Sequence, residues 1–141
     1  MSVTKQYEDV RYSGLMKLAD DLDKLNNGKF HVVFRKNAMA KWDSQDHSYT
    51  KCHATPHFWA YIMASGDVYG CSAYLLDDRF KYGNIHKQTF TEIWEGPQRQ
   101  KNWKYVLNEL DITECRQNCR MDEVNRYLWE LKHPSEHANF I

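Results

Sequence analysis

The sequence contains four cysteines, which fall into two distant pairs. Cys52 and Cys71 form the first pair, with the spacing C-x13-G-x4-C, and Cys115 and Cys119 form the second pair, with the spacing C-x3-C. Four thiols placed in this way can hold one metal centre only if the chain between the pairs folds back on itself. The most economical interpretation is one site that is closed late in the sequence.

Gly66 lies between two short apolar and aromatic runs, residues 57–64 and 67–73. Glycine accepts the positive φ that a tight turn demands, so the pattern predicts a β-hairpin that carries Cys71 back along the strand following Cys52. The second cysteine pair lies in a polar loop just before a helix-like segment at residues 121–132. One ligand pair on a hairpin and another at a helix entrance can surround a single ion or cluster.

Thiolate ligation by four cysteines suits both an iron–sulfur cluster and structural zinc. Zinc sites usually take two short cysteine pairs, and here only the late pair is short. Histidines offer alternative ligands, and the candidates are His53, His57, His133 and His137. Pro134 lies between the last two and breaks a regular helix, so their i, i+4 spacing does not guarantee a common face. Because cytosolic thiols stay reduced, we expect metal binding and not disulfides.

Further segments complete a family pattern: DDRFKYGNIHKQTFTEIWEG follows Cys71, and DEVNRYLWEL follows the late pair. Together with the cysteines, they make residues 50–141 resemble the C-terminal auxiliary-cluster domain of radical S-adenosylmethionine (radical SAM) enzymes, the SPASM group and its shorter twitch version. The late C-x3-C pair departs from the CxxC spacing common in that family. The resemblance implies one four-iron four-sulfur (4Fe–4S) cluster, as in the twitch version, with the ligands Cys52, Cys71, Cys115 and Cys119.

The resemblance also implies a role for such a cluster, in electron transfer or substrate positioning during a radical oxidation or modification reaction. Arg116, Gln117 and Asn118 lie in the late loop and could supply contacts around the sulfurs. Radical SAM enzymes hold their catalytic cluster on a CxxxCxxC loop, but no cysteine precedes Cys52. We therefore expect no activity of the chain alone, with S-adenosylmethionine bound by a radical SAM barrel domain or subunit. The alternative is a zinc-stabilised, non-catalytic interaction module.

The predicted fold class is α+β, a small β-hairpin plus helices over residues 50–141, preceded by a helix-strand unit over residues 1–49. Leucines recur at three- and four-residue steps in residues 7–27 and predict an amphipathic helix there. The β-branched and aromatic run at residues 29–39 predicts a strand. A helix followed by a strand resembles the end of a partial α/β barrel, although these residues could equally pack against the cysteine domain.

Within residues 50–141, further local signals predict where turns and helices begin. Gly83 and Asn84 predict a turn, and Pro97 suits the first position of a helix over residues 97–110. Two acidic pairs, Asp77–Asp78 and Asp122–Glu123, stand at turn and helix-start positions, where carboxylates favour capping. We expect the apolar C-terminal residues 137–141 to dock on the domain.

The charge balance and the absence of several sequence motifs argue against some classes of function. Lys plus Arg and Asp plus Glu both number 19, so no charge excess suggests a nucleic-acid or membrane partner. The N-terminus has no apolar signal core and no apolar run approaches 18 residues, so we expect a cytoplasmic protein. The sequence contains no Ser-His-Asp order, glycine-rich phosphate loop or HExxH element, and hydrolase and nucleotide-binding functions lack support.

Overall fold

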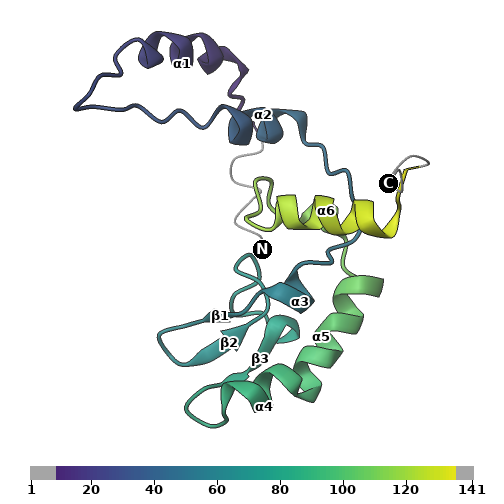
Figure 1. The fold of residues 1–141 in the computed structure, drawn as a ribbon. Coiled ribbons are helices and arrows are strands. Elements are labelled where there is room, and N and C mark those ends of the chain that lie inside the picture. Colours follow the sequence, from purple (N-terminus) through teal and green to yellow (C-terminus); the bar gives the residue numbers. More distant parts are fainter. Residues whose placement is uncertain (1–8, 136–141) are drawn as a thin grey trace, which may run out of the picture. The chain divides into compact units, whose positions relative to one another are not determined.

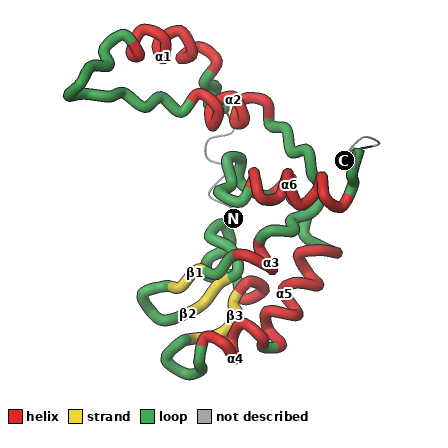
Figure 2. Tube along the Cα trace, in the orientation of Figure 1, coloured by secondary structure: helices red, strands yellow, loops and turns green. Residues whose placement is uncertain are grey.

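The computed structural model describes residues 9–135, which separate into two compact units between Asp46 and His47. The elements of both units are drawn in Figure 1 and coloured by type in Figure 2. Within these residues, every helix is too short or too polar to span a lipid bilayer. Helices and one small antiparallel sheet make up the regular structure of this part, which confirms the predicted α+β class.

The first unit consists of short helices joined by irregular chain. A 3-10 turn at Ser13–Leu15 leads into α1 (Met16–Asp23), and α2 spans Lys36–Ser44. The turn is tied to α2, because the backbone N–H of Tyr12 donates to the carboxylate of Asp43 at 2.8 and 3.0 Å.

The helix in the first unit is shorter than the leucine pattern predicts. Residues 7 and 8 lie outside the described part, and α1 ends at Asp23 instead of residue 27. Beyond the helix, the Asn27 side chain accepts hydrogen bonds from the backbone N–H groups of Lys29 and Phe30, which offers this segment a turn in place of a further helical turn. Ala19 is the buried residue of α1, whereas Leu18 is 47% exposed.

The strand predicted over residues 29–39 is wrong. Apart from one isolated bridge between Asn27 and Phe30, the segment pairs with nothing in the described chain, and α2 begins at Lys36. Val33 is 84% exposed. The preference of β-branched residues for strands reflects packing against cross-strand neighbours, and this segment has no neighbouring strand that would supply them. The helix-strand unit expected at residues 1–49 is therefore a pair of short helices in the described chain.

The second unit contains the predicted β-hairpin. A short helix, α3 (Thr55–Phe58), precedes β1 (Tyr61–Ile62), which pairs antiparallel with β2 (Asp67–Tyr69). Gly66 adopts φ +79° in the turn between them, the left-handed conformation for which glycine was expected there. The first strand is shorter than predicted because α3 takes up the first residues of the run at 57–64.

A third strand corrects the predicted turn at Gly83 and Asn84. Both residues belong to β3 (Lys81–Asn84), which follows a 3-10 turn at Asp78–Phe80 and pairs antiparallel with β2. Gly83 lies opposite Val68 in this pairing. The sheet order is β1-β2-β3, so the hairpin strand that leads to Cys71 is the central strand.

Helices then cover β3, as Figure 1 shows. The first is α4 (Phe90–Glu95), whose start is fixed by a capping box between Thr89 and Glu92. Pro97 opens α5 (Pro97–Asn108), as predicted. A 3-10 turn at Ile112–Glu114 carries the chain to the second cysteine pair, and α6 spans Asp122–Lys132, in agreement with the predicted helix.

The core of the second unit reaches the cysteines directly. One cluster of buried side chains joins the hairpin, α5 and the chain after it; it contains Tyr49, Cys52, Tyr69, Phe80, Val106, Leu110 and Ile112. Cys71 and Cys115 pack against this cluster. The first cysteine is thus part of the hydrophobic core, and the site is held by the same contacts that hold the fold.

Candidate metal centre

The four cysteines come from four separate places in the second unit. Cys52 precedes α3, and Cys71 follows the central strand β2 by two residues. Cys115 caps the 3-10 turn at Ile112–Glu114, and Cys119 stands three residues before the start of α6. All four are free thiols, and all four line one cavity. The chain folds back between the two pairs, as the sequence requires for a single site.

The cavity is small and mainly apolar. Its volume is about 30 Å³ for the centre of a water-sized sphere, whereas one water needs roughly 10–15 Å³ by this measure. Apolar and aromatic side chains form much of the wall, among them Tyr49, Tyr74, Phe80, Leu110 and Ile112. Among residues 9–135, no group of three or more His, Cys, Asp or Glu side chains is arranged to hold a single metal ion. The four thiols surround a space between them.

Each sulfur has a hydrogen-bond partner. The backbone N–H of Ala73 donates to Cys71 Sγ at 3.4 Å, and the backbone N–H of Met121 donates to Cys119 Sγ at 3.4 Å. The Tyr74 hydroxyl lies 3.5 Å from Cys115 Sγ. Hydrogen bonds of this kind orient thiolate ligands and set the reduction potential of iron–sulfur clusters.

Asn125 holds the loop that carries the first cysteine. Its buried side-chain oxygen accepts from the backbone N–H groups of His53 and Ala54 at 2.7 and 2.8 Å, and its Nδ2 donates to Cys52 Sγ at 3.5 Å. Cys52 also contacts Thr55 Oγ1 at 3.4 Å. Sequence reasoning missed Asn125 because more than 70 residues separate it from this loop and nothing in its surroundings marks it.

Burial opposes ionisation of Cys71, Cys115 and Cys119. It raises the pKa of Cys71 and Cys119, and it raises the pKa of Cys115 to about 12. In the absence of a bound metal, these three cysteines are therefore protonated at neutral pH. Metal ligation requires thiolates, so binding must release the thiol protons and offset the cost of placing negative charge in an apolar cavity. Four cysteines are a donor set that iron–sulfur clusters and zinc both accept.

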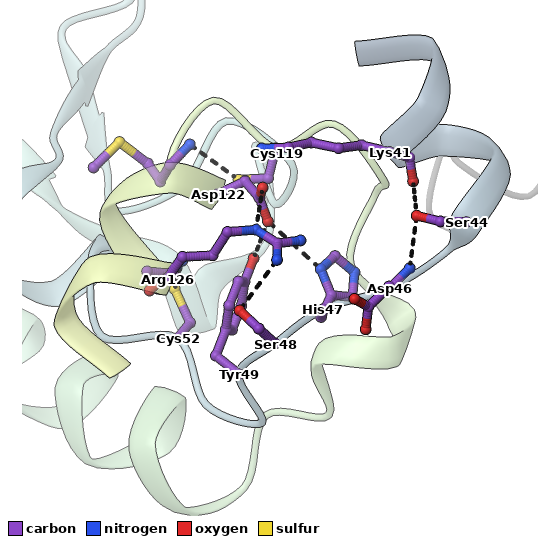
Figure 3. A network of polar contacts seen from close by, with 12 residues as sticks. Lys41, Ser44, Asp46, His47, Ser48, Tyr49, Cys52, Cys119, Asp122 and Arg126 are labelled. Carbon is purple, nitrogen blue, oxygen red and sulfur yellow. Dashed lines mark hydrogen bonds and ion pairs between the residues drawn. The ribbon is translucent and has the colours of Figure 1, made fainter. Parts of the chain in front are cut away.

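A polar network at the start of α6 includes two residues of the cavity wall, His47 and Tyr49, and Figure 3 shows both of them and Arg126 pointing toward Asp122. Tyr49 donates its hydroxyl to Asp122 Oδ1 at 3.1 Å, and Arg126 Nε donates to Asp122 Oδ2 at 2.9 Å. His47 Nδ1 lies 3.7 Å from Asp122 Oδ1. Burial and then Asp122 raise the pKa of Tyr49, so its hydroxyl stays protonated and can donate. Asp122 occupies the expected helix start, but its partners at residues 47 and 49 were not foreseen.

The three histidine alternatives within residues 9–135 do not line the cavity. His53 and His133 both lie against Trp129, with ring centroids 6.1 and 4.0 Å from the indole, and His57 lies edge-on to Trp103 with the ring centroids 4.5 Å apart. Burial lowers the pKa of His53 and of His57. His137 lies outside the described residues. The histidine that does line the cavity is His47, which the sequence reasoning did not single out.

Of the three residues named in the late loop, one lines the cavity and two do not. Arg116 lines the cavity, and its Nη2 donates to Ser72 Oγ at 3.2 Å. Gln117 and Asn118 are absent from the cavity wall, and Asn118 has φ +56° in the turn that separates the late pair.

Comparison with known proteins identifies the segment that contains all four cysteines. Residues 52–120 match the family model described as SPASM, an iron–sulfur cluster-binding domain. Searches of curated proteins and of solved structures gave no match. The matched segment ends before α6, so Asn125 and Asp122 lie beyond it, and His47 and Tyr49 precede it. The family match confirms the resemblance drawn from the cysteine spacing, because residues 52–120 match a SPASM iron–sulfur cluster-binding domain.

Proposed function

We propose that Cys52, Cys71, Cys115 and Cys119 ligate one 4Fe–4S cluster, which serves as the auxiliary cluster of a radical SAM enzyme. The observation that carries the proposal is the common cavity, which all four thiols line. Thiols placed around a space suit a cluster of several atoms better than a single ion. The hydrogen bonds to the four sulfurs would then orient the ligands.

An electron-transfer role is favoured over direct substrate binding. A bound 4Fe–4S cluster exchanges single electrons, and four cysteines would leave none of its irons open for a substrate ligand. The protein's own contribution is to hold the sulfurs and to keep water away. Tyr49, Phe80 and Ile112 line the cavity with apolar surface, and a low-polarity surrounding is one of the factors that set a cluster's potential.

The substrate and S-adenosylmethionine would be bound elsewhere. All four cysteines of the sequence are used by the proposed site, and none forms a CxxxCxxC loop. The catalytic cluster would therefore belong to a radical SAM barrel, present as another domain or as a separate subunit. A co-purifying protein that carries the CxxxCxxC motif would identify this partner.

The test is metal and sulfide analysis of the chain purified without oxygen, together with its visible spectrum and that of Cys71→Ser. We expect about four irons and four sulfides per chain and a loss of the cluster absorption in the variant, because one ligand is removed. Val68→Ala is the matched control, since Val68 is fully buried in a separate core cluster with Tyr82 and Ile93. This control should lose stability but keep the iron.

Two results would contradict the proposal. Stoichiometric zinc without sulfide would indicate the zinc-stabilised interaction module instead. Iron and sulfide retained in full by Cys71→Ser would remove that cysteine from the ligand set.

A further inference from the structure

Three buried nitrogen atoms on the wall of the cysteine cavity lack hydrogen-bond partners among the described residues. They are Nδ1 and Nε2 of His47 and Nε of Arg116. Two further nitrogens of this kind, on His53 and Arg99, belong to residues that do not line the cavity. A buried donor without an acceptor costs free energy, and such groups in folded proteins call for a specific explanation.

Neither ring nitrogen of His47 is hydrogen-bonded within the described residues, although the ring lines the cavity. Its Nδ1 lies 3.7 Å from the carboxylate of Asp122, and its ring packs against Tyr49 with the centroids 5.3 Å apart. Figure 3 shows the imidazole beside this network. At 3.7 Å the Asp122 carboxylate is too distant to accept a hydrogen bond from Nδ1. In the neutral tautomer with its proton on Nε2, that N–H has no acceptor among the described residues.

Arg116 is fixed in a comparable way. Its Nη2 donates to Ser72 Oγ at 3.2 Å, next to Cys71 in the chain, and its Nε is buried at the wall. The guanidinium therefore places a permanent positive charge at the wall of the cavity that the four thiols line.

We infer that His47 Nε2 and Arg116 Nε donate hydrogen bonds to sulfur atoms of the bound cluster and thereby raise its reduction potential. The inference rests on the proposed function, because the acceptors are the sulfurs of that cluster. Reduction adds negative charge to the cluster and its sulfurs, and a donor stabilises the more negative state more strongly. Both residues are positioning and tuning groups, and neither is a ligand. His47 lies outside the SPASM segment at residues 52–120.

The experiment compares reduction potentials in the full chain loaded with iron and sulfide without oxygen. The variants are His47→Phe, which keeps an aromatic ring, and Arg116→Met, which keeps an unbranched side chain. His57→Phe is the control for a histidine that does not line the cavity. Arg120→Met is the control for charge, because Arg120 is exposed in the same region of the chain.

At a fixed applied potential, we expect each test variant to lower the ratio of reduced to oxidised cluster about tenfold, which for one electron corresponds to ~59 mV. Iron and sulfide content should stay at the wild-type level, and both controls should keep the wild-type ratio. A wild-type ratio in both test variants would overturn the inference while leaving the cluster assignment intact. An equal shift in Arg120→Met would also overturn it, since general charge would then explain the effect.

A second measurement uses the wild-type chain, so it tests the role of His47 even if a variant loses its cluster. The wild-type chain, labelled with ¹⁵N in its histidine rings and reduced, should show a weak nitrogen coupling to the cluster in pulsed electron paramagnetic resonance. The absence of this coupling would overturn the role of His47. A wild-type chain that binds no iron and sulfide would instead refute the proposed function itself, and the inference would fall with it.

Discussion

Asn125, on the last helix, donates to the sulfur of Cys52 and accepts two backbone N–H groups from the residues that follow it. The same side chain therefore fixes both the loop and the orientation of the first thiol. Because α6 lies beyond the SPASM segment, the loop that carries Cys52 depends on a helix outside the family match.

Replacing Asn125 by leucine should strongly destabilise the second unit. The variant keeps the branched shape of the side chain but leaves the amides of His53 and Ala54 buried without an acceptor, and the free energy of unfolding should fall by at least about 2 kcal/mol. The measurement is urea unfolding of the chain without metal. Asn108→Leu is the control, because Asn108 makes an exposed contact to Lys104 O. Similar unfolding midpoints for the two variants would show that Asn125 does not hold the loop.

The Tyr49–Asp122 hydrogen bond should show energetic coupling across the second unit. We expect Tyr49→Phe and Asp122→Ala to interact by about 1–3 kcal/mol in a double-mutant cycle, because the bond joins a buried hydroxyl to a carboxylate. Tyr127→Phe paired with Asp122→Ala is the control, since Tyr127 is on the same helix but 61% exposed. Additive effects within about 0.3–0.5 kcal/mol in the Tyr49 cycle would contradict a bond of this strength.

The hairpin should lose stability in acid through Asp67. Its carboxylate accepts from Lys81, Asn84 and Ser65, and these contacts, Lys81 first, lower the pKa of Asp67 to about 2. A carboxyl group whose pKa is lower in the folded state stabilises the fold above its unfolded pKa. This stabilisation is lost as the pH falls from about 4 to about 2.

Asp67→Asn should therefore be less stable than the wild type at pH 7 and should show a weaker loss of stability between about pH 4 and pH 2. Urea midpoints measured across this range test the expectation. Glu109→Gln, an exposed change near the end of α5, serves as the control. An unchanged acid limb in Asp67→Asn would show that another group causes the acid sensitivity.

Local sequence signals predicted the parts of the fold that neighbouring residues decide. Gly66 adopts the expected left-handed turn, and Pro97 opens α5 as expected. The prediction of a strand at residues 29–39 was wrong because strand formation depends on a neighbouring strand, and the local sequence pattern does not show whether one is present. The third strand was missed on the same ground, since its pairing with β2 joins distant residues.

In the candidate site, too, the sequence predicted some residues and missed others. Cysteine is rare enough that its count and spacing led to one site, and the structure brings all four thiols to one cavity. The groups around them, Asn125, Asp122, Tyr49 and His47, are common residue types that reach the site through contacts over as many as 73 positions. Their roles follow from tertiary packing, so spacing along the chain does not reveal them.

Gly83 allows a direct test of whether local turn preference or tertiary packing requires a residue. Its sequence context suggested a turn, but in β3 a Cβ atom at this position would lie 2.9 Å from Ile93 Cγ1 and 2.9 Å from Gln88 Oε1. The glycine therefore allows α4 to pack closely against the sheet, and Ile93 is almost completely buried there.

Gly83→Ala should lower the free energy of unfolding by about 1–3 kcal/mol, because the added methyl group crowds a well-packed core. The matched control is Gly28→Ala, where a Cβ would meet no atom within 4 Å. Thermal unfolding of both variants, with the second unit followed by near-UV circular dichroism, measures the difference. If glycine at position 83 served only backbone freedom in a turn, the two alanine variants would differ little. A lower unfolding temperature for Gly83→Ala alone would instead show that close packing of α4 on β3 selects glycine here.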